Sequence, residues 1–293
     1  SLPFLLHGFD YLKNNEEASA EFGLEGNLYL RYYLYIVYNT LGDLERAKYY
    51  LEDGVKVAGS SDSPIANLIN GVFSGIDGEI EKSKYYYNNA IRGTDLKDPN
   101  ENWIMPRAMI EIAMIEIDEN SEKSFETCLQ AYKISEKYNI PSGQEISLTS
   151  AALIAEQNLN WEVLDMVLHN LISFYEKQPP IKNYYSEVFD NILLYYELGV
   201  VVKIILGKRM EALRMLEISK SRKLKQNLNI PANSYDFTAV FEPDEFLIGI
   251  EQVLSSDHST FKQAIIPQDS LLKYNEYRDL LFRYFYNGEK ISY

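Results

Sequence analysis

The side chains best suited to catalysis or metal binding are few and scattered along this chain. The three histidines, His7, His169 and His258, form no H-x-x-x-H or H-E-x-x-H pair. The single cysteine, Cys128, has no partner for a C-x-x-C site or an intramolecular disulfide. The sequence also lacks the phosphate-binding pattern G-x-x-x-x-G-K-S/T. We therefore expect no catalytic residue, no metal and no cofactor, and we do not expect an enzyme.

Tyrosine and asparagine are the polar residues that stand out as possible ligand contacts. The 24 tyrosines cluster in the runs 32–35, 85–87 and 195–196. A tyrosine ring can fill a core, or it can present its hydroxyl on a binding surface, and the sequence leaves both readings open. Asparagine amides donate and accept hydrogen bonds together, so they can hold the backbone of an extended peptide. The candidate peptide-binding residues are Tyr35, Asn39, Asn67, Asn70 and Tyr86.

Charge is distributed unevenly. The formal net charge of −15 repels nucleic-acid phosphates, so no bound nucleic acid is expected. Basic residues nevertheless gather between 208 and 225. Within that stretch a candidate docking site for an acidic partner comprises Lys220, Arg222, Lys223 and Lys225. The alternative is a solvated basic face that offsets the chain's own negative charge. Glu111 and Glu116 are expected to be solvated carboxylates.

These side chains must be positioned by helices, because apolar residues recur every three or four positions along most of the chain. The clearest pattern lies between residues 34 and 90. Gly42-Asp43 predicts the end of one helix and the N-cap of the next, and Asp77-Gly78 repeats this turn, with Gly78 lying 36 positions after Gly42. A fixed period in the thirties built of two helices indicates a helical repeat. Further helices are predicted near 103–117, 121–138, 142–157, 161–176, 183–206, 208–227, 243–256 and 268–287, and Ser142 is predicted to cap its helix.

The repeat resembles the tetratricopeptide repeat (TPR), in which small residues at the helix crossing alternate with large rings. In the first unit the matching residues are Leu34, Tyr38, Gly42, Ala47, Leu51 and Gly54. In the second they are Gly71, Gly78, Tyr87 and Ala90, with Ser83 in place of an alanine. Later units match less fully, through Ser124, Cys128 and Ala131 and through Gly207, Ala212 and Leu216. The resemblance implies an all-α, right-handed superhelical solenoid of antiparallel helix pairs whose concave groove binds a protein or peptide.

Three segments are expected: an N-terminal helical cap (1–26), the TPR-like array (27–228) and an irregular helical C-terminal cap (229–293). The single cysteine and the absence of an Asn-x-Ser/Thr acceptor indicate a reducing, cytoplasmic location. No apolar run is long enough to span a bilayer. The chain begins with serine, so an N-terminal domain that has been removed is considered.

Two functions agree with these observations. The first is a non-enzymatic scaffold or adaptor that binds a protein or peptide in its concave groove. The alternative is the peptide-sensing domain of a bacterial transcriptional regulator whose DNA-binding head is absent, because such sensors also contain degenerate repeats rich in Tyr, Asn and Lys. The sequence leaves the partner and the oligomeric state open.

Overall fold

The computed structural model describes residues 2–177, 185–208 and, apart from 209, 213 and 217, those up to 219. The regular structure of these residues is entirely helical. The chain divides into two units, residues 1–154 and 155–293, which are considered separately below. The predicted C-terminal cap (229–293) and the basic docking residues Lys220, Arg222, Lys223 and Lys225 lie outside the described residues.

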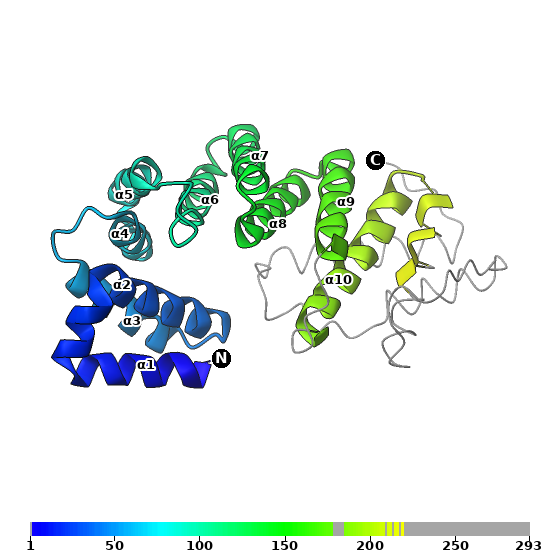
Figure 1. The fold of residues 1–293 in the computed structure, drawn as a ribbon. Coiled ribbons are helices and arrows are strands. Elements are labelled where there is room, and N and C mark those ends of the chain that lie inside the picture. The colour runs from blue at the N-terminus through cyan, green and yellow to red at the C-terminus, as the bar shows by residue number, and fades with distance from the viewer. Residues whose placement is uncertain (1, 178–184, 209, 213, 217, 220–293) are drawn as a thin grey trace. The chain divides into compact units, whose positions relative to one another are not determined.

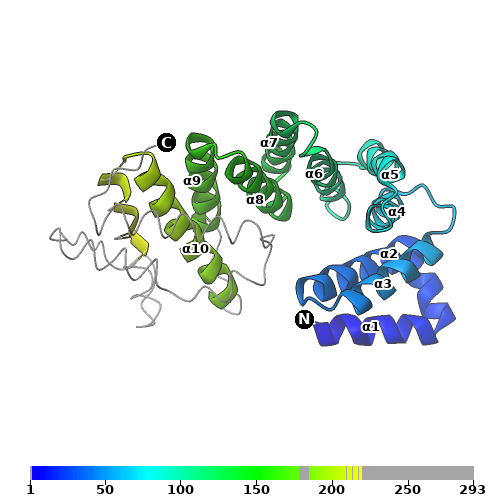
Figure 2. The same cartoon turned by 180° about the vertical axis from the view of Figure 1, so that it is seen from behind.

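The first unit is a succession of packed helices (Figure 1). They are α1 (Leu2–Asn14), α2 (Glu16–Thr40), α3 (Leu44–Ala58), α4 (Pro64–Ile76), α5 (Ile80–Gly93), α6 (Ile104–Glu116), α7 (Ser121–Lys137) and most of α8 (Pro141–Gln157). Helix α2 packs against α3, α4 against α5, and α6 against α7, while α4 also contacts both α2 and α6 (Figure 2). The expected all-helical class is confirmed, and α4 is the element that links α2 to α6.

The predicted turns between helices are confirmed at two glycines. Gly42 has φ +75° and Gly78 has φ +79°, the left-handed conformation that glycine adopts without steric cost. Asp43 caps α3 as predicted, because its Oδ1 accepts a hydrogen bond from the backbone N–H of Arg46 at 3.1 Å. The predicted cap at Ser142 is wrong. Helix α8 begins one residue earlier, at Pro141, because proline fits the first helical position, where no N–H is needed.

Helices α4 and α5 cross closely because small residues line the crossing. Ser83 donates a hydrogen bond from its Oγ to the carbonyl of Gly71 at 2.7 Å. The Tyr87 ring lies directly over Gly71, so a Cβ added there would be 2.6 Å from two ring carbons. Backbone atoms can approach this closely only where side chains are small. This contact therefore determines how near α5 comes to α4.

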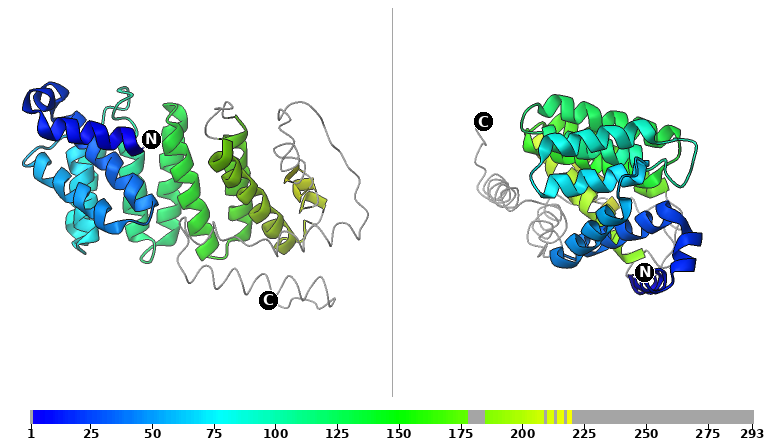
Figure 3. Two further views of the ribbon diagram at one scale, coloured as in Figure 1. Left: turned by 90° about the horizontal axis from the view of Figure 1, so that it is seen from below. Right: turned by 90° about the vertical axis from the view of Figure 1, so that its left-hand side faces the viewer.

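Helix α2 is bent near its start, where it lies beside α1 (Figure 3). Gly23 has φ 77° and ψ 167° inside the helix, a combination that is essentially restricted to glycine. The Asn27 side chain holds the bend by donating from Nδ2 to the carbonyls of Ser19 (3.0 Å) and Gly23 (2.8 Å). The predicted array start at residue 27 lies just beyond this bend.

Cys128 is completely buried on α7, at a position where the repeat pattern expects a small residue. Burial raises the pKa of its thiol to about 12, so almost no thiolate forms near neutral pH. We predict that Cys128 in the folded protein does not react with DTNB at pH 8 and that one thiol per chain reacts after unfolding in guanidinium. Rapid labelling of the folded protein would contradict this burial.

The second unit contains α9 (Trp161–Lys177) packed against α10 (Tyr185–Ile205). Asp165 of α9 accepts hydrogen bonds from the Nζ of Lys203 (2.8 Å) and of Lys208 (2.7 Å). The buried Asp165 carboxylate therefore joins α9 to α10, through Lys203, and to the residues after α10, through Lys208. Lys203 also donates to Glu211 at 2.9 Å. Among the described helices of the whole chain, none has the length and apolar character that crossing a membrane requires.

Candidate functional site

The candidate site is formed by one face of α2 and one face of α6. Tyr29, Tyr32 and Tyr33 follow one another at helical spacing on α2, with Tyr35 nearby. On α6 and its preceding residue, every fourth position contributes a large side chain: Trp103, Arg107 and Glu111. We call these seven residues the α2–α6 seam. Because α4 contacts both helices, their side chains meet although they lie about 70 residues apart in sequence.

The first end of the seam is aromatic. The Trp103 ring stacks on Tyr32 with 5.5 Å between centroids and 29° between planes. Its centroid also lies 6.1 Å from that of Tyr29 and 6.0 Å from that of Tyr33. The indole Nε1 donates to the carbonyl of Asn100 at 2.9 Å, which fixes the ring against its own loop. Tyr33 is 46% exposed, so this end presents an aromatic surface to solvent.

The other end of the seam is charged. Arg107 forms an ion pair with Glu111, and the two side chains are 26% and 24% exposed. Burial by itself would lower the pKa of Arg107, but the adjoining Tyr32 and the Glu111 carboxylate more than reverse this, so the pKa is raised and the guanidinium stays charged. Burial raises the pKa of the Tyr32 and Tyr35 hydroxyls, so both remain protonated hydrogen-bond donors at neutral pH.

Two polar atoms of the seam are buried without a hydrogen-bond partner. They are the hydroxyl oxygen of Tyr32, a residue only 2% exposed, and Nε of Arg107. Neither bonds to any residue that the structure describes. Leaving such a group unsatisfied costs about 1–3 kcal/mol, and buried polar groups nearly always have a partner. The seam therefore holds unused hydrogen-bonding capacity beside its aromatic surface.

The predicted peptide-binding residues are dispersed. Tyr35 belongs to the seam and is 8% exposed. Asn39 is exposed in the last turn of α2, and Asn70 is half-buried on α4. Tyr86 lies on α5 and packs edge-to-face on Tyr85 with 5.5 Å between centroids. Among the described residues, no hydrogen bond joins these asparagines to the seam.

Asn67 has a role within the chain itself. Its side chain is buried, and Nδ2 donates to the backbone carbonyls of Asp62 (2.8 Å) and Ser63 (3.2 Å) at the start of α4. Its amide donor is thus used by the loop that precedes the helix. Sequence reasoning missed Tyr32, Trp103 and Arg107 as site residues. The four-residue spacing of Trp103, Arg107 and Glu111 is the signal that could have placed them on one face.

The expectation that Glu111 and Glu116 are solvated is wrong. Glu111 pairs with Arg107. Glu116 is 17% exposed and lies 3.3 Å from Nζ of Lys84 and 2.7 Å from Nζ of Lys123. The hydrogen bond from Lys123 contributes most to lowering the pKa of Glu116. This carboxylate therefore ties α6 to α5 and α7 and is a structural group.

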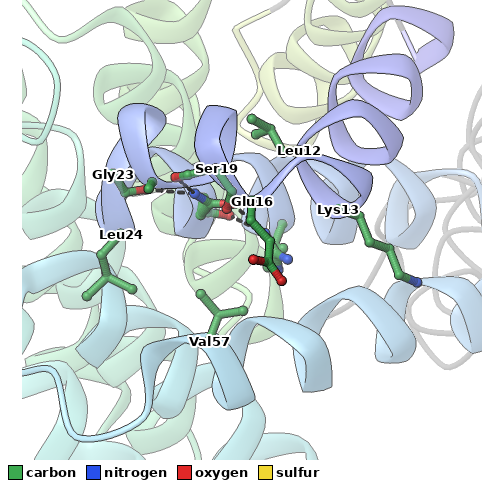
Figure 4. A pocket seen from close by; sticks show the side chains of 10 residues that line it. Leu12, Lys13, Glu16, Ser19, Gly23, Leu24 and Val57 are labelled. Atoms are coloured by element: carbon green, nitrogen blue, oxygen red, sulfur yellow. Dashed lines mark hydrogen bonds between the residues drawn. The ribbon is translucent and has the colours of Figure 1, made fainter.

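A hollow of about 470 Å³ lies between α1, α2 and α3 (Figure 4). Leu12 comes from α1, Glu16 and Leu24 from α2 and Val57 from α3. Its buried polar groups are mutually satisfied: Asn27 bonds to the bent backbone, and Arg31 donates to Asp53 at 2.8 Å and to Asn27. The seam, in contrast, retains unpaired groups, so we favour it as the candidate site.

No group of three or more His, Cys, Asp or Glu side chains in the described part of the chain is arranged to hold a metal ion. Comparison of the sequence with models of protein families and with curated proteins finds no match.

Proposed function

We propose that this chain is a non-enzymatic, TPR-like helical module that binds an extended segment of another protein, or a peptide, across the α2–α6 seam. One observation carries the proposal: Tyr32 and Arg107 each keep a buried polar atom without a partner, next to an exposed aromatic surface. A right-handed arrangement of the helix pairs belongs to the same proposal.

The two unpaired atoms match the chemistry of a peptide backbone. The Tyr32 hydroxyl and the Arg107 Nε–H can both donate, and the carbonyl oxygens of an extended chain accept. A ligand that displaced the side chains covering these two buried atoms would satisfy groups that are costly to leave unpaired, which favours the bound state. Rings such as Trp103 and Tyr33 add contact area with little loss of side-chain freedom.

The charge states of the seam support binding rather than proton transfer. The tyrosine hydroxyls keep their protons because burial raises their pKa, and Arg107 keeps its charge. General acid–base catalysis needs a group that gains and loses a proton near the working pH, and neither kind of group does so. Peptide binding would serve an adaptor that holds a partner protein, and equally a sensor domain of a transcriptional regulator that responds to a free peptide.

The Tyr32→Phe substitution tests the proposal because it removes only the hydroxyl. The free protein should become about 1 kcal/mol more stable, since an unsatisfied buried group is lost. Peptides selected from a random display library on the wild-type chain should bind the variant about five- to tenfold more weakly, because one hydrogen bond is worth about 1 kcal/mol. Guanidinium unfolding and fluorescence anisotropy measure the two effects.

Tyr85→Phe is the matched control, because Tyr85 is 61% exposed on α5 and lies outside the seam. It should change neither stability nor peptide affinity. If every selected peptide bound Tyr32→Phe as tightly as the wild-type chain, the seam would not be the binding site and the proposed function would lose its support.

A further inference from the structure

We propose that the segment bound at the seam is basic and places an arginine side chain on its aromatic end, between the rings of Tyr33 and Trp103 and the carboxylates of Glu25, Asp98 and Glu101. This inference rests on the proposed function and specifies the chemistry of the partner. The basic stretch near residue 220 is a candidate docking site for an acidic partner or a solvated basic face, whereas the seam would select a basic segment.

Three carboxylates lie near Tyr29 at the aromatic end of the seam. Glu25 lies one helical turn before Tyr29 on α2, and Asp98 and Glu101 lie in the loop that leads to Trp103. All three are close enough for their negative charges to add to burial in raising the pKa of the Tyr29 hydroxyl. None of them forms an ion pair with any residue that the structure describes. Negative charge therefore gathers here on carboxylates that form no ion pair with a described residue.

The loop carboxylates also keep oxygen atoms free for a ligand. Asp98 accepts hydrogen bonds from the backbone and side chain of Asn100 through Oδ1 alone (2.8 and 3.0 Å). Glu101 accepts from the Asp95 N–H through Oε1 at 2.8 Å. The second oxygen of each group accepts no hydrogen bond from a described residue. These contacts hold the carboxylates in place and leave acceptors that a guanidinium fork can use.

Arginine suits this surface better than lysine does. Its planar guanidinium stacks on aromatic faces and donates two parallel hydrogen bonds to a carboxylate, whereas an ammonium group is a compact and strongly hydrated charge. Neighbouring basic residues of the described chain do not neutralise these carboxylates through an ion pair. Lys97, in the same loop, is exposed, and Arg107 is already neutralised by Glu111. The local balance therefore stays negative, and an acidic segment or a nucleic acid would be repelled.

Three fluorescein-labelled peptides test the inference by fluorescence anisotropy: GRGRGRG, GKGKGKG and GEGEGEG. We expect the arginine peptide to bind the whole chain at least tenfold more tightly than the glutamate peptide and about threefold more tightly than the lysine peptide. The triple variant Glu25→Gln, Asp98→Asn, Glu101→Gln should weaken arginine-peptide binding about tenfold. Glutamine and asparagine retain the oxygens that accept from the loop backbone, so the loop should stay folded.

The matched control removes the same number of charges elsewhere. Glu45→Gln, Glu122→Gln and Glu126→Gln replace exposed carboxylates of α3 and α7 that form no described ion pair, and this variant should bind within twofold of the wild-type chain. Equal losses in both triple variants would show general charge attraction and overturn the inference. So would a preference for the glutamate peptide.

Tyr33→Leu tests the contribution of the ring, because it keeps an apolar side chain at a position that is 46% exposed. Arginine-peptide binding should fall about fivefold, and an unchanged affinity would contradict stacking on this face.

The two proposals can fail separately. Selected peptides that need the Tyr32 hydroxyl but are not basic would refute only the basic partner. A selection that yields no peptide dependent on Tyr32 would instead refute the proposed function.

Discussion

Alanine at position 71 should lower the free energy of unfolding by about 2–3 kcal/mol, although alanine is the better helix former. The added methyl group would stand 2.6 Å from two carbons of the Tyr87 ring, which is much closer than van der Waals contact. Tyr87 is only 2% exposed, so its ring is enclosed by protein and cannot simply swing out into solvent. Helices α4 and α5 would have to separate, and the 2.7 Å hydrogen bond from Ser83 to the Gly71 carbonyl would lengthen.

Gly8→Ala is the control for this prediction. Gly8 lies within α1, where the nearest atom to an added Cβ is 4.0 Å away, so alanine should stabilise the chain by up to about 1 kcal/mol through helix propensity. Guanidinium unfolding followed by circular dichroism measures both variants. Adding Tyr87→Leu to Gly71→Ala should cost less than the sum of the two single changes. If Gly71→Ala proved as stable as Gly8→Ala, then α4 and α5 would not cross as closely as the structure shows.

Asparagine at position 165 should lower the free energy of unfolding by about 3 kcal/mol, because breaking a buried ion pair leaves an uncompensated charge. Asp165 and Lys203 have side chains only 12% and 14% exposed, and Lys208 contributes a second positive charge at 2.7 Å. Asparagine fills nearly the same volume but cannot balance two ammonium groups. Chemical unfolding monitored by circular dichroism measures the loss, and Glu162→Gln, an exposed change on the same helix, should alter stability by less than about 0.5 kcal/mol.

The same carboxylate should give the protein a distinct acid sensitivity. Burial by itself raises the pKa of Asp165, but hydrogen bonds from Lys203 and Lys208 more than reverse this, so its pKa in the folded state lies below the ordinary value of 3.8. As the pH falls, Asp165 is therefore protonated in the unfolded chain at a higher pH than in the folded chain. The stability that the ionised Asp165 contributes is fully present above its pKa in the unfolded chain, and it is lost as the pH falls through its pKa in the folded chain.

Between about pH 4 and pH 2, the wild-type chain should consequently lose stability more steeply than Asp165→Asn does. Glu162→Gln should follow the wild-type curve. Parallel curves for the wild-type chain and Asp165→Asn would show that the lysines do not hold this carboxylate ionised.

Sequence alone predicted those parts of the fold that depend on neighbouring residues. The turns at Gly42 and Gly78 and the cap at Asp43 are local, since each joins residues no more than a few positions apart. The incorrect prediction of a cap at Ser142 also has a local cause, because the neighbouring Pro141 takes the first position of the helix. Asn67 was assigned to a groove, yet its amide turns back to carbonyls four and five residues earlier. That alternative is open to any asparagine in a first helical turn.

The seam could not be predicted in the same way, because its contacts join α2 to α6 through the packing of α4. The tyrosine run at 32–35 indicated that some rings would be buried and others exposed. It could not indicate that Trp103 would stack on Tyr32, because this depends on the path of the loop between α5 and α6. Nor could it indicate that the Tyr32 hydroxyl would remain unpartnered, which is a property of the assembled helices.

Trp103 also gives the seam an optical signal of its own. The chain has two tryptophans, Trp103 in the first unit and Trp161 in the second. With Trp161 replaced by phenylalanine, all indole emission would arise from the seam. The rings of Tyr29, Tyr32 and Tyr33, with centroids 5.5–6.1 Å from that of Trp103, would pass their excitation to the indole. A ligand that covers Trp103 would thus shift the wavelength of maximum emission and change its intensity. Binding of a ligand at the seam could therefore be followed without attaching a dye.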